Sequence, residues 1–336
     1  MDMIRPAQLV SSPVLNGKLN DNYFRVLPKL ALKYNLKNDH GNIYATMSKG
    51  HRSGGYNVQM MADVMRNAMQ TDMTDVTRQY CNDLLQQQAD NARTEQLRQM
   101  FLGIKTAMNN GMPQTTLPDV GTIVTYKPEY CWNYEAGTHL NFLNRTLTAD
   151  FSFFFIDTHD QQIARFTNSG MGRAMVNAGQ SHSCGLELSL RGNFLDDKLS
   201  VALNYGYTHA VFHKYDAGNG NNYTGNKVPF IPEHNTGAFI DYRLPLKHGL
   251  FEAVTFGINA KGFGRIYWTE ANNAYQNFYA TSGAHLQLET SRWQLDLWGK
   301  NLTQTKYHTF YFESMGKSFY QKGNPLQIGF DLSFKL

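Results

Sequence analysis

The sequence predicts an all-β protein, and more specifically the wall of an antiparallel transmembrane β-barrel, on three observations. Apolar and polar residues alternate with a period of two over about eleven segments of roughly ten to fourteen residues. Short and long connections alternate between these segments. Aromatic residues make up 13% of the 336 residues and charged residues only 17%, which is low for a surface that lies wholly in water. A wall with one face in lipid and the other in water accounts for all three.

The last predicted strand shows the alternation most clearly. One face carries Leu326, Ile328, Phe330, Leu332, Phe334 and Leu336, and the other carries Gln327, Gly329, Asp331, Ser333 and Lys335. The same pattern predicts strands at about 24–36, 42–50, 132–142, 147–155, 186–190, 199–207, 234–244, 251–264, 277–290 and 292–303. A strand tilted by about 45° needs roughly 9–11 residues to cross the apolar layer. Most of these segments are long enough to cross a membrane.

The lengths of the connections distinguish a membrane barrel from a soluble β-sandwich, which also alternates apolar and polar residues. Tight connections fall near 38–41, 144–145, 195–197, 246–249 and Ser291, and long ones near 51–130, 159–181, 213–233, 265–276 and 305–324. Outer-membrane barrels keep this rhythm because their periplasmic turns are short and their outside loops are long. The predicted strand ends also carry aromatic residues suited to interfacial girdles, namely Trp132, Tyr207, Tyr267, Trp268 and Trp293.

One segment, at about 58–110, has helical spacing instead. Met61, Val64, Met65 and Ala68 follow the i, i+3, i+4, i+7 pattern of an apolar helix face. Thr71–Asp72 is a plausible N-cap for a second helix, and the segment 109–113 ends the helical region. We expect a helical insertion in the longest outside loop. It is either a lid or partner-binding hairpin, or an ornament packed on the barrel rim, with its methionine-rich stripe as its core.

No catalytic, cofactor or metal-binding constellation can be assembled from the sequence, which argues against an enzyme. Gly179–Ser183 resembles a nucleophile elbow, but Ser183 occupies the position that requires glycine. The predicted lumen face carries two histidines and five carboxylates, which we expect to be wall residues: His139, His285, Glu135, Glu187, Asp241, Glu289 and Asp296. The three cysteines Cys81, Cys131 and Cys184 match no disulfide framework or metal spacing. No basic run suits nucleic acid.

Motifs between and within these strands resemble those of TonB-dependent receptors. The segments 27–34 and 43–57 are similar to barrel strands of that family, and Pro128–Glu129 with Asn133–Gly137 resembles its P-E … N-Y-E-x-G landmark. Further matches, in order, are Asn177–Gly179 with Gly185–Glu187, then Gly225, Pro229, Pro232 and His234, then Asn301–Thr303 with Tyr307, and finally Gly323–Pro325. Their order and spacing cover about residues 24–336. Family members often end on an aromatic residue, whereas this chain ends on Leu336.

The resemblance implies energised uptake across the outer membrane of a Gram-negative bacterium. The intact parent protein would bind an extracellular small molecule or metal chelate, such as a ferric siderophore, haem or cobalamin, and would work with TonB and outer-membrane lipid as partners. Outside-loop residues that could grip such a ligand are Arg52, Tyr56, Arg165, Arg173, Tyr215 and Tyr223. The contacting residues and the ligand's identity do not follow from the sequence.

The resemblance also implies a plug domain, a TonB-contacting segment (the TonB box) and a barrel of about 22 strands. We expect residues 1–336 to supply only the C-terminal part of that barrel, without plug or TonB box. The segment Met1–Pro6 has no signal-peptide pattern. A plugless porin-like channel and a non-functional truncated fragment stay open as alternatives.

Overall fold

The computed structural model describes residues 20–58, 60–111, 124–166, 173–217, 220–314 and 316–334. The chain divides into two compact units. We call the unit formed by residues 24–53, 127–163 and 176–336 the wall, and the unit that contains residues 54–126 and 164–175 the insertion unit.

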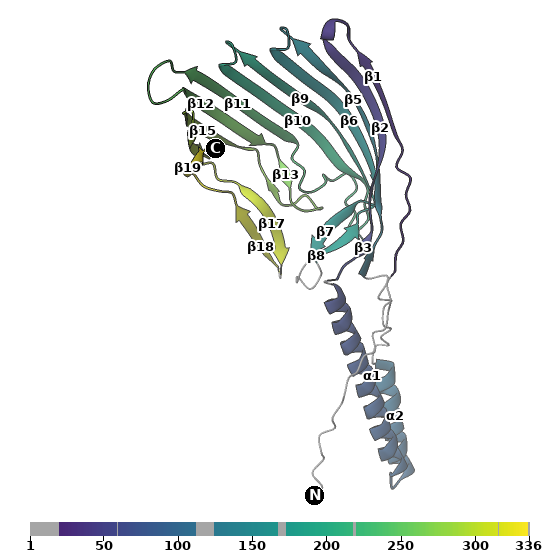
Figure 1. Ribbon diagram of the computed structural model, residues 1–336. Helices are drawn as coiled ribbons and strands as arrows, with labels where there is room; N and C mark the ends of the chain where they lie inside the picture. The colour runs from purple at the N-terminus through teal and green to yellow at the C-terminus, as the bar shows by residue number, and fades with distance from the viewer. Residues whose placement is uncertain are drawn as a thin grey trace. The chain divides into compact units, whose positions relative to one another are not determined.

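The wall is one 11-stranded antiparallel sheet (Figure 1). In spatial order its strands are β1 (Lys29–Asn35), β2 (Gly41–Arg52), β5 (Glu129–Phe142), β6 (Leu147–His159), β9 (Gln180–Phe194), β10 (Leu199–Lys214), β11 (His234–Pro245), β12 (Ala253–Phe263), β15 (Tyr279–Glu289), β16 (Trp293–Lys300) and β19 (Gln327–Phe334). Each pairs with its predecessor along the chain of wall strands. The predicted number of strands and their antiparallel arrangement are confirmed. Residues 335–336 of the predicted last strand lie outside the described residues.

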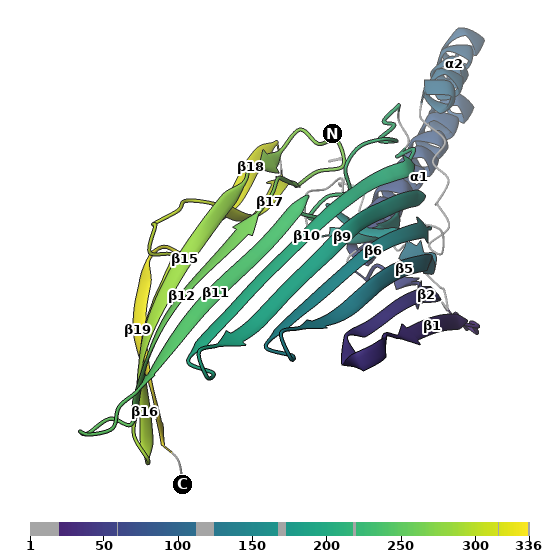
Figure 2. The same ribbon diagram turned by 90° about the horizontal axis from the view of Figure 1, so that it is seen from above.

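The sheet is curved but open, so it is part of a barrel (Figure 2). Within the described residues, β1 pairs only with β2, and β19 pairs only with β16. Successive wall strands are joined by tight connections at one end, as between β5 and β6, and by long ones at the other. The predicted rhythm of short and long connections is therefore confirmed.

The strand register gives the wall two unlike faces. One row across neighbouring strands contains Tyr44, Gly137, Ser152 and Glu187. The opposite face carries apolar side chains that stay exposed, such as Phe153 at 55%, Ile258 at 58% and Phe330 at 68%. Exposed apolar residues in such numbers suit contact with lipid. We call the polar side the lumen face and the apolar side the lipid face.

The long connections contain short paired strands that the sequence did not predict. They form four ribbons, β3 (Gly55–Tyr56) with β4 (Thr125–Tyr126), β7 (Gln162–Phe166) with β8 (Arg173–Asn177), β13 (Ile266–Tyr267) with β14 (Tyr275–Gln276), and β17 (His308–Ser314) with β18 (Lys317–Lys322). A ribbon of two residues per strand carries no detectable alternation. The tight β1–β2 connection holds a short 3-10 helix, η1 (Lys37–Asp39).

The interfacial prediction for Trp268 is wrong. Its side chain is only 6% exposed and packs with Ile266, Ala274 and Tyr311 in a small core formed by the long connections. A second loop core surrounds Phe212, which is 1% exposed. These connections are therefore packed around small hydrophobic cores of their own.

The insertion unit holds two antiparallel helices, α1 (Met60–Asp90) and α2 (Glu95–Gly111). A helical insertion is confirmed, but the predicted break at Thr71–Asp72 is wrong because α1 continues through it. The hydroxyl of Thr74 donates to the carbonyl of Gln70 at 2.8 Å, which satisfies it inside the helix. The real break precedes α2, where Thr94 Oγ1 accepts from the backbone N–H of Leu97 at 3.3 Å and caps the helix.

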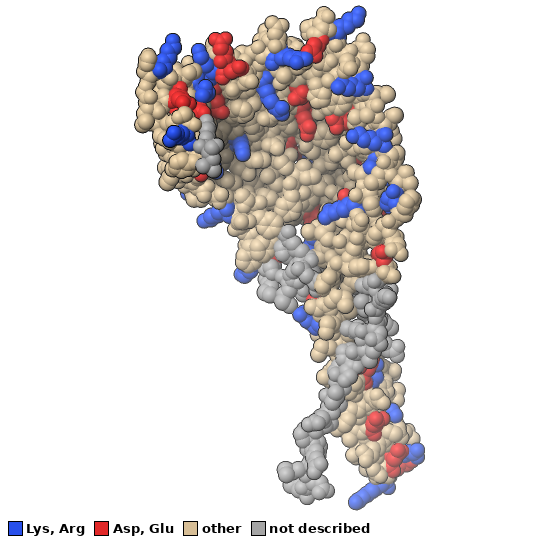
Figure 3. All heavy atoms as spheres, in the orientation of Figure 1, with Lys and Arg blue, Asp and Glu red and all other residues tan. Residues whose placement is uncertain are grey.

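Charge is distributed evenly over the visible surface. In Figure 3, basic and acidic side chains intermingle and form no large single-sign patch on the face shown. This agrees with the formal net charge of only +4. No described helix is long and apolar enough to cross a membrane.

Candidate functional site

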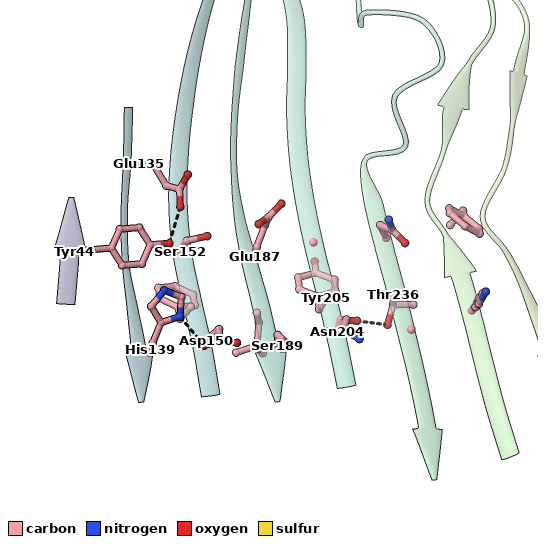
Figure 4. A pocket seen from close by; sticks show the side chains of 17 residues that line it. Tyr44, Glu135, His139, Asp150, Ser152, Glu187, Ser189, Asn204, Tyr205 and Thr236 are labelled. Atoms are coloured by element: carbon pink, nitrogen blue, oxygen red, sulfur yellow. Dashed lines mark hydrogen bonds and ion pairs between the residues drawn. The ribbon is translucent and has the colours of Figure 1, made fainter. Parts of the chain in front are cut away.

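The lumen face of the wall is hollowed by a concavity of about 640 Å³ (Figure 4). Side chains and backbone from β2, β5, β6 and β9 to β12 surround it. Its lining is Tyr44, Glu135, His139, Asp150, Phe151, Ser152, Glu187, Leu188, Ser189, Asn204, Tyr205, Gly206, Asn235, Thr236, Gly237, Lys261 and Phe263. The concavity is a property of the sheet, since strands far apart in sequence contribute to it.

A hydrogen bond between Tyr44 and Glu135 organises one side of this concavity. The Tyr44 hydroxyl donates to Glu135 Oε1 at 2.6 Å across 91 residues of sequence. Gly137 lies opposite Tyr44 in the register, and a Cβ there would come within 2.7 Å of the Tyr44 hydroxyl. Glycine at this position therefore leaves the space that lets the tyrosine reach the carboxylate. This gives the N-Y-E-x-G pattern a physical reason.

A second polar pair adjoins the first. His139 Nδ1 lies 2.7 Å from Asp150 Oδ1, and the imidazole stacks on the Tyr44 ring with centroids 5.0 Å apart. The sequence predicted that His139 and Glu135 share the lumen face, and the register confirms this. It could not predict the link through Tyr44, because register between distant strands is not readable from one strand.

Glu135 and Glu187 are two carboxylates in this concavity with no ion-pair partner among the described residues. Glu187 is exposed to the lumen, and Figure 4 shows Glu187 and Glu135 on neighbouring parts of the same polar face. Two unneutralised carboxylates repel each other and favour a cation between or above them. The two carboxylates could therefore hold a basic group on this side of the lumen.

The other predicted lumen residues lie on β11, β15 and β16, and three of them have polar partners. Arg243 forms an ion pair with Glu289 at 2.8 Å, and His285 lies 3.8 Å from Asp241. Asp296 lies opposite Asp331 in the register and lines a second concavity of about 720 Å³. Asp241, His285 and Glu289 thus join polar pairs as predicted, whereas Asp296 Oδ1 is buried without a hydrogen-bond partner among the described residues. Within the described residues no group of three His, Cys, Asp or Glu side chains could hold a metal ion.

The loop residues predicted as a possible ligand grip differ in exposure, since Arg52 is exposed and Tyr56, Arg165 and Tyr223 are partly buried. Tyr215 is only 3% exposed and packs in the loop core around Phe212, so its ring is unavailable at the surface. The side chain of Arg173 lies outside the described residues. Lys227 and Glu233, which the sequence did not single out, form an ion pair at 2.8 Å, and the hydrogen bond from Lys227 lowers the pKa of the Glu233 carboxyl.

The nucleophile-elbow resemblance also fails in the structure. Ser181 and His182 lie within β9, and Ser181 is 2% exposed. A nucleophile elbow requires a sharp strand-to-helix turn that exposes the serine. The segment is therefore ordinary wall strand.

An open sheet with one lipid face and one lumen face is typical of part of a membrane β-barrel, and the comparison with protein families agrees with this. The model of the family "TonB dependent receptor-like, beta-barrel" matches residues 9–302. The chain belongs to this family. Its members are transport receptors of the Gram-negative outer membrane, not enzymes, and the lipid face and polar lumen face suit that location.

The proteins to which the chain is similar are named as receptors. The chain is 25% identical over 179 residues to the pesticin receptor of Yersinia pestis, over 53% of this chain and 25% of that receptor. Two solved structures share the fold, the ferric yersiniabactin uptake receptor FyuA from Yersinia pestis and the siderophore receptor PiuA from Acinetobacter baumannii. FyuA has a TM-score of 0.62 and 19% identity, covering 92% of this chain and 37% of FyuA. PiuA has a TM-score of 0.54 and 16% identity, covering 91% and 35%.

The chain is much shorter than these relatives. It spans about a quarter of the curated receptor and little more than a third of either structure. What the structure describes is thus a sector of wall comparable to one part of a longer receptor.

Proposed function

We propose that this chain forms the C-terminal part of the barrel of a receptor that imports a ferric siderophore or a similar metal chelate, with energy transmitted by TonB. The observation that carries the proposal is the open eleven-stranded sheet with one lipid face and one lumen face, in a chain of the TonB-dependent receptor family. The names of the similar structures support a siderophore as ligand.

The direction of the strands supports closure by an unlike stretch of wall. Eleven is odd, so β1 and β19 run in the same direction in an all-antiparallel sheet. A second copy inserted the same way up would place parallel strands at both seams. A further stretch of sheet could close the barrel with antiparallel pairs throughout. Its first and last strands would have to run opposite to β1 and β19. Closure is needed because unpaired backbone groups in lipid cost several kcal/mol each.

The carboxylates Glu135 and Glu187 would then face whatever fills the lumen. We assign them the role of holding basic side chains of a plug domain in the intact receptor. Tyr44 fixes the orientation of Glu135 through its 2.6 Å hydrogen bond. The helices α1 and α2, between β2 and β5 in the chain, would belong to an extracellular loop.

Uptake of ⁵⁵Fe by iron-starved source cells tests the proposed function, with ferric yersiniabactin and ferric citrate as separate probes. Deleting the gene is expected to abolish uptake of one probe, and collapsing the proton gradient is expected to have the same effect. Restoration by the intact gene is the control. Passive, gradient-independent leakage of both probes would support a channel instead, and unchanged uptake of both would overturn a receptor for this ligand class.

A further inference from the structure

We propose that His209, Lys227 and Glu233 form a pH-sensitive attachment between β10 and the connection that follows it. The attachment holds near neutral pH and is released when His209 gains a proton. We call these three residues the loop triad. The inference does not depend on the uptake function proposed above.

Lys227 is the centre of the loop triad. Its Nζ lies 2.9 Å from His209 Nδ1 and 2.8 Å from Glu233 Oε1. The side chains of Lys227 and Glu233 are only 23% and 29% exposed. A lysine ammonium offers donors alone, so His209 Nδ1 must accept, and it can accept only while the imidazole is neutral with its proton on Nε2. The contact therefore defines the protonation state in which the triad forms.

Protonation of His209 would break its contact with Lys227. A proton on Nδ1 removes the accepting lone pair and places a second positive charge beside the ammonium. Histidine is the side chain that ordinarily changes charge between about pH 5 and pH 8. The hydrogen bond from Lys227 lowers the pKa of the Glu233 carboxyl, which stays ionised in that range. Of the three groups, only the histidine therefore changes its charge in mild acid.

The surroundings of the triad keep Glu233 anionic. The titratable and charged groups on the neighbouring elements are Tyr207 and His213 on β10, Cys184 on β9, His234 on β11, and Arg265 and Glu270 in the connection between β12 and β15. Arg265 and His234 act on Glu233 by charge, in the direction that favours its ionised form. After His209 is protonated, Glu233 can still hold Lys227, but both belong to the same connection. The side-chain link from that connection to β10 is then lost.

The triad lies where the β10–β11 connection is joined to two neighbours. Lys227 forms an isolated bridge with Val211 of β10. Its backbone N–H donates to Asn272 Oδ1 at 2.7 Å, and Asn272 Nδ2 donates to its carbonyl oxygen at 3.0 Å. Asn272 lies in the connection between β12 and β15. Loss of the contact with His209 is therefore expected to loosen the bridge to β10 and, with it, the pairing of the two connections.

Hydrogen exchange measured on the intact protein in detergent tests the proposal. Protection factors are compared at about pH 7.5 and about pH 5.5, on either side of the ordinary histidine pKa, so that the change in intrinsic exchange rate cancels. Peptides covering residues 223–233 are expected to lose roughly threefold or more of their protection at the lower pH, as in local opening. His209→Gln keeps an acceptor that gains no proton, and its protection is expected to stay high at both pH values. His209→Lys carries a permanent charge and is expected to show the loosened state at both.

His234→Gln is the matched control. His234 also lies near Glu233, but its Nδ1 lies 2.9 Å from the Tyr205 hydroxyl. This variant is expected to respond to pH like the parent, and peptides from β5 are expected to keep their protection throughout. The proposal would be overturned by a parent whose residues 223–233 do not respond to pH, or by a response that persists in His209→Gln. An equal loss in β5 would also overturn it, because acid would then unfold the whole wall.

Discussion

The wall and the helical insertion are stabilised in different ways. In the wall each inner strand pairs with two others, and contacts such as Tyr44–Glu135 join residues 91 apart. In the insertion, polar contacts between the helices come from residues closer in sequence, as in the paired amides of Asn82 and Asn109 and the Lys105–Gln86 hydrogen bond at 3.0 Å. The stability of the wall therefore depends on strands from different parts of the chain packing closely together. The stability of the helical hairpin depends mainly on the formation of its two helices.

The largest expected effect on folding comes from adding a side chain at Gly185, where neighbouring strands pack closely. A Cβ on Gly185 would lie 2.0 Å from the carbonyl oxygen of Tyr207 and 2.6 Å from the Phe154 ring. Backbone of a neighbouring strand cannot move aside without breaking the ladder, so Gly185→Val is expected to abolish folding of the wall in the intact protein. The measurement is the fraction of outer-membrane protein that migrates as the compact, heat-modifiable species.

Gly237 provides the control within the same sheet. A Cβ there would meet nothing within 4 Å, so Gly237→Ala is expected to keep the compact species. Comparable loss in both variants would mean that glycine is required in these strands for a reason other than close packing.

The next effect distinguishes the two faces of the wall. Leu203 is 40% exposed on the lipid face, whereas its neighbour Asn204 lines the lumen concavity. A lysine near the middle of the lipid face costs about 2–4 kcal/mol, so Leu203→Lys is expected to lower the stability of the folded barrel by that amount. Asn204→Lys is expected to cost far less, since the lumen face is polar. Urea unfolding in lipid vesicles measures both, and equal losses would contradict the assignment of the faces.

The sequence predicted the wall well because alternation is a local signal. All eleven wall strands and their tight turns follow from it, and so does the placement of His139, Glu135 and Glu187 on one face. The β3–β4 and β13–β14 ribbons escaped detection because their strands have only two residues each. Trp268 was misplaced because a tryptophan near a strand end fits equally well in a lipid interface and in a loop core.

Contacts between strands were not predictable from one sequence. The Tyr44–Glu135 hydrogen bond depends on a register set by the whole sheet, and only Gly137 opposite Tyr44 hints at it. In the insertion, Thr71–Asp72 resembles a helix start, yet the same residue types also occur inside helices when a hydroxyl bonds to the preceding turn. The true cap, Thr94, follows a short turn after the end of α1 at Asp90, and its hydroxyl accepts from the backbone N–H of Leu97.

The smallest expected effect is on the stability of the helical hairpin, and it is an increase and not a loss. Gly103 lies in the interior of α2, and a Cβ there would meet nothing within 4 Å. Glycine in a helix interior costs about 0.5–1 kcal/mol relative to alanine because it loses more backbone entropy on folding. Gly103→Ala is therefore expected to slow hydrogen exchange of the α2 amides by up to about fivefold, without altering the compact species of the wall.

Gly111, the last residue of α2, is the matched position for this measurement. A Cβ there also meets nothing within 4 Å, but a helix end frays and gains little from alanine. Gly111→Ala is expected to leave exchange in the middle of α2 nearly unchanged. If Gly103→Ala instead left exchange unchanged, or accelerated it, the hairpin would owe its stability to contacts beyond helix propensity. The contrast between a wall governed by distant contacts and a hairpin governed by local ones would then fail.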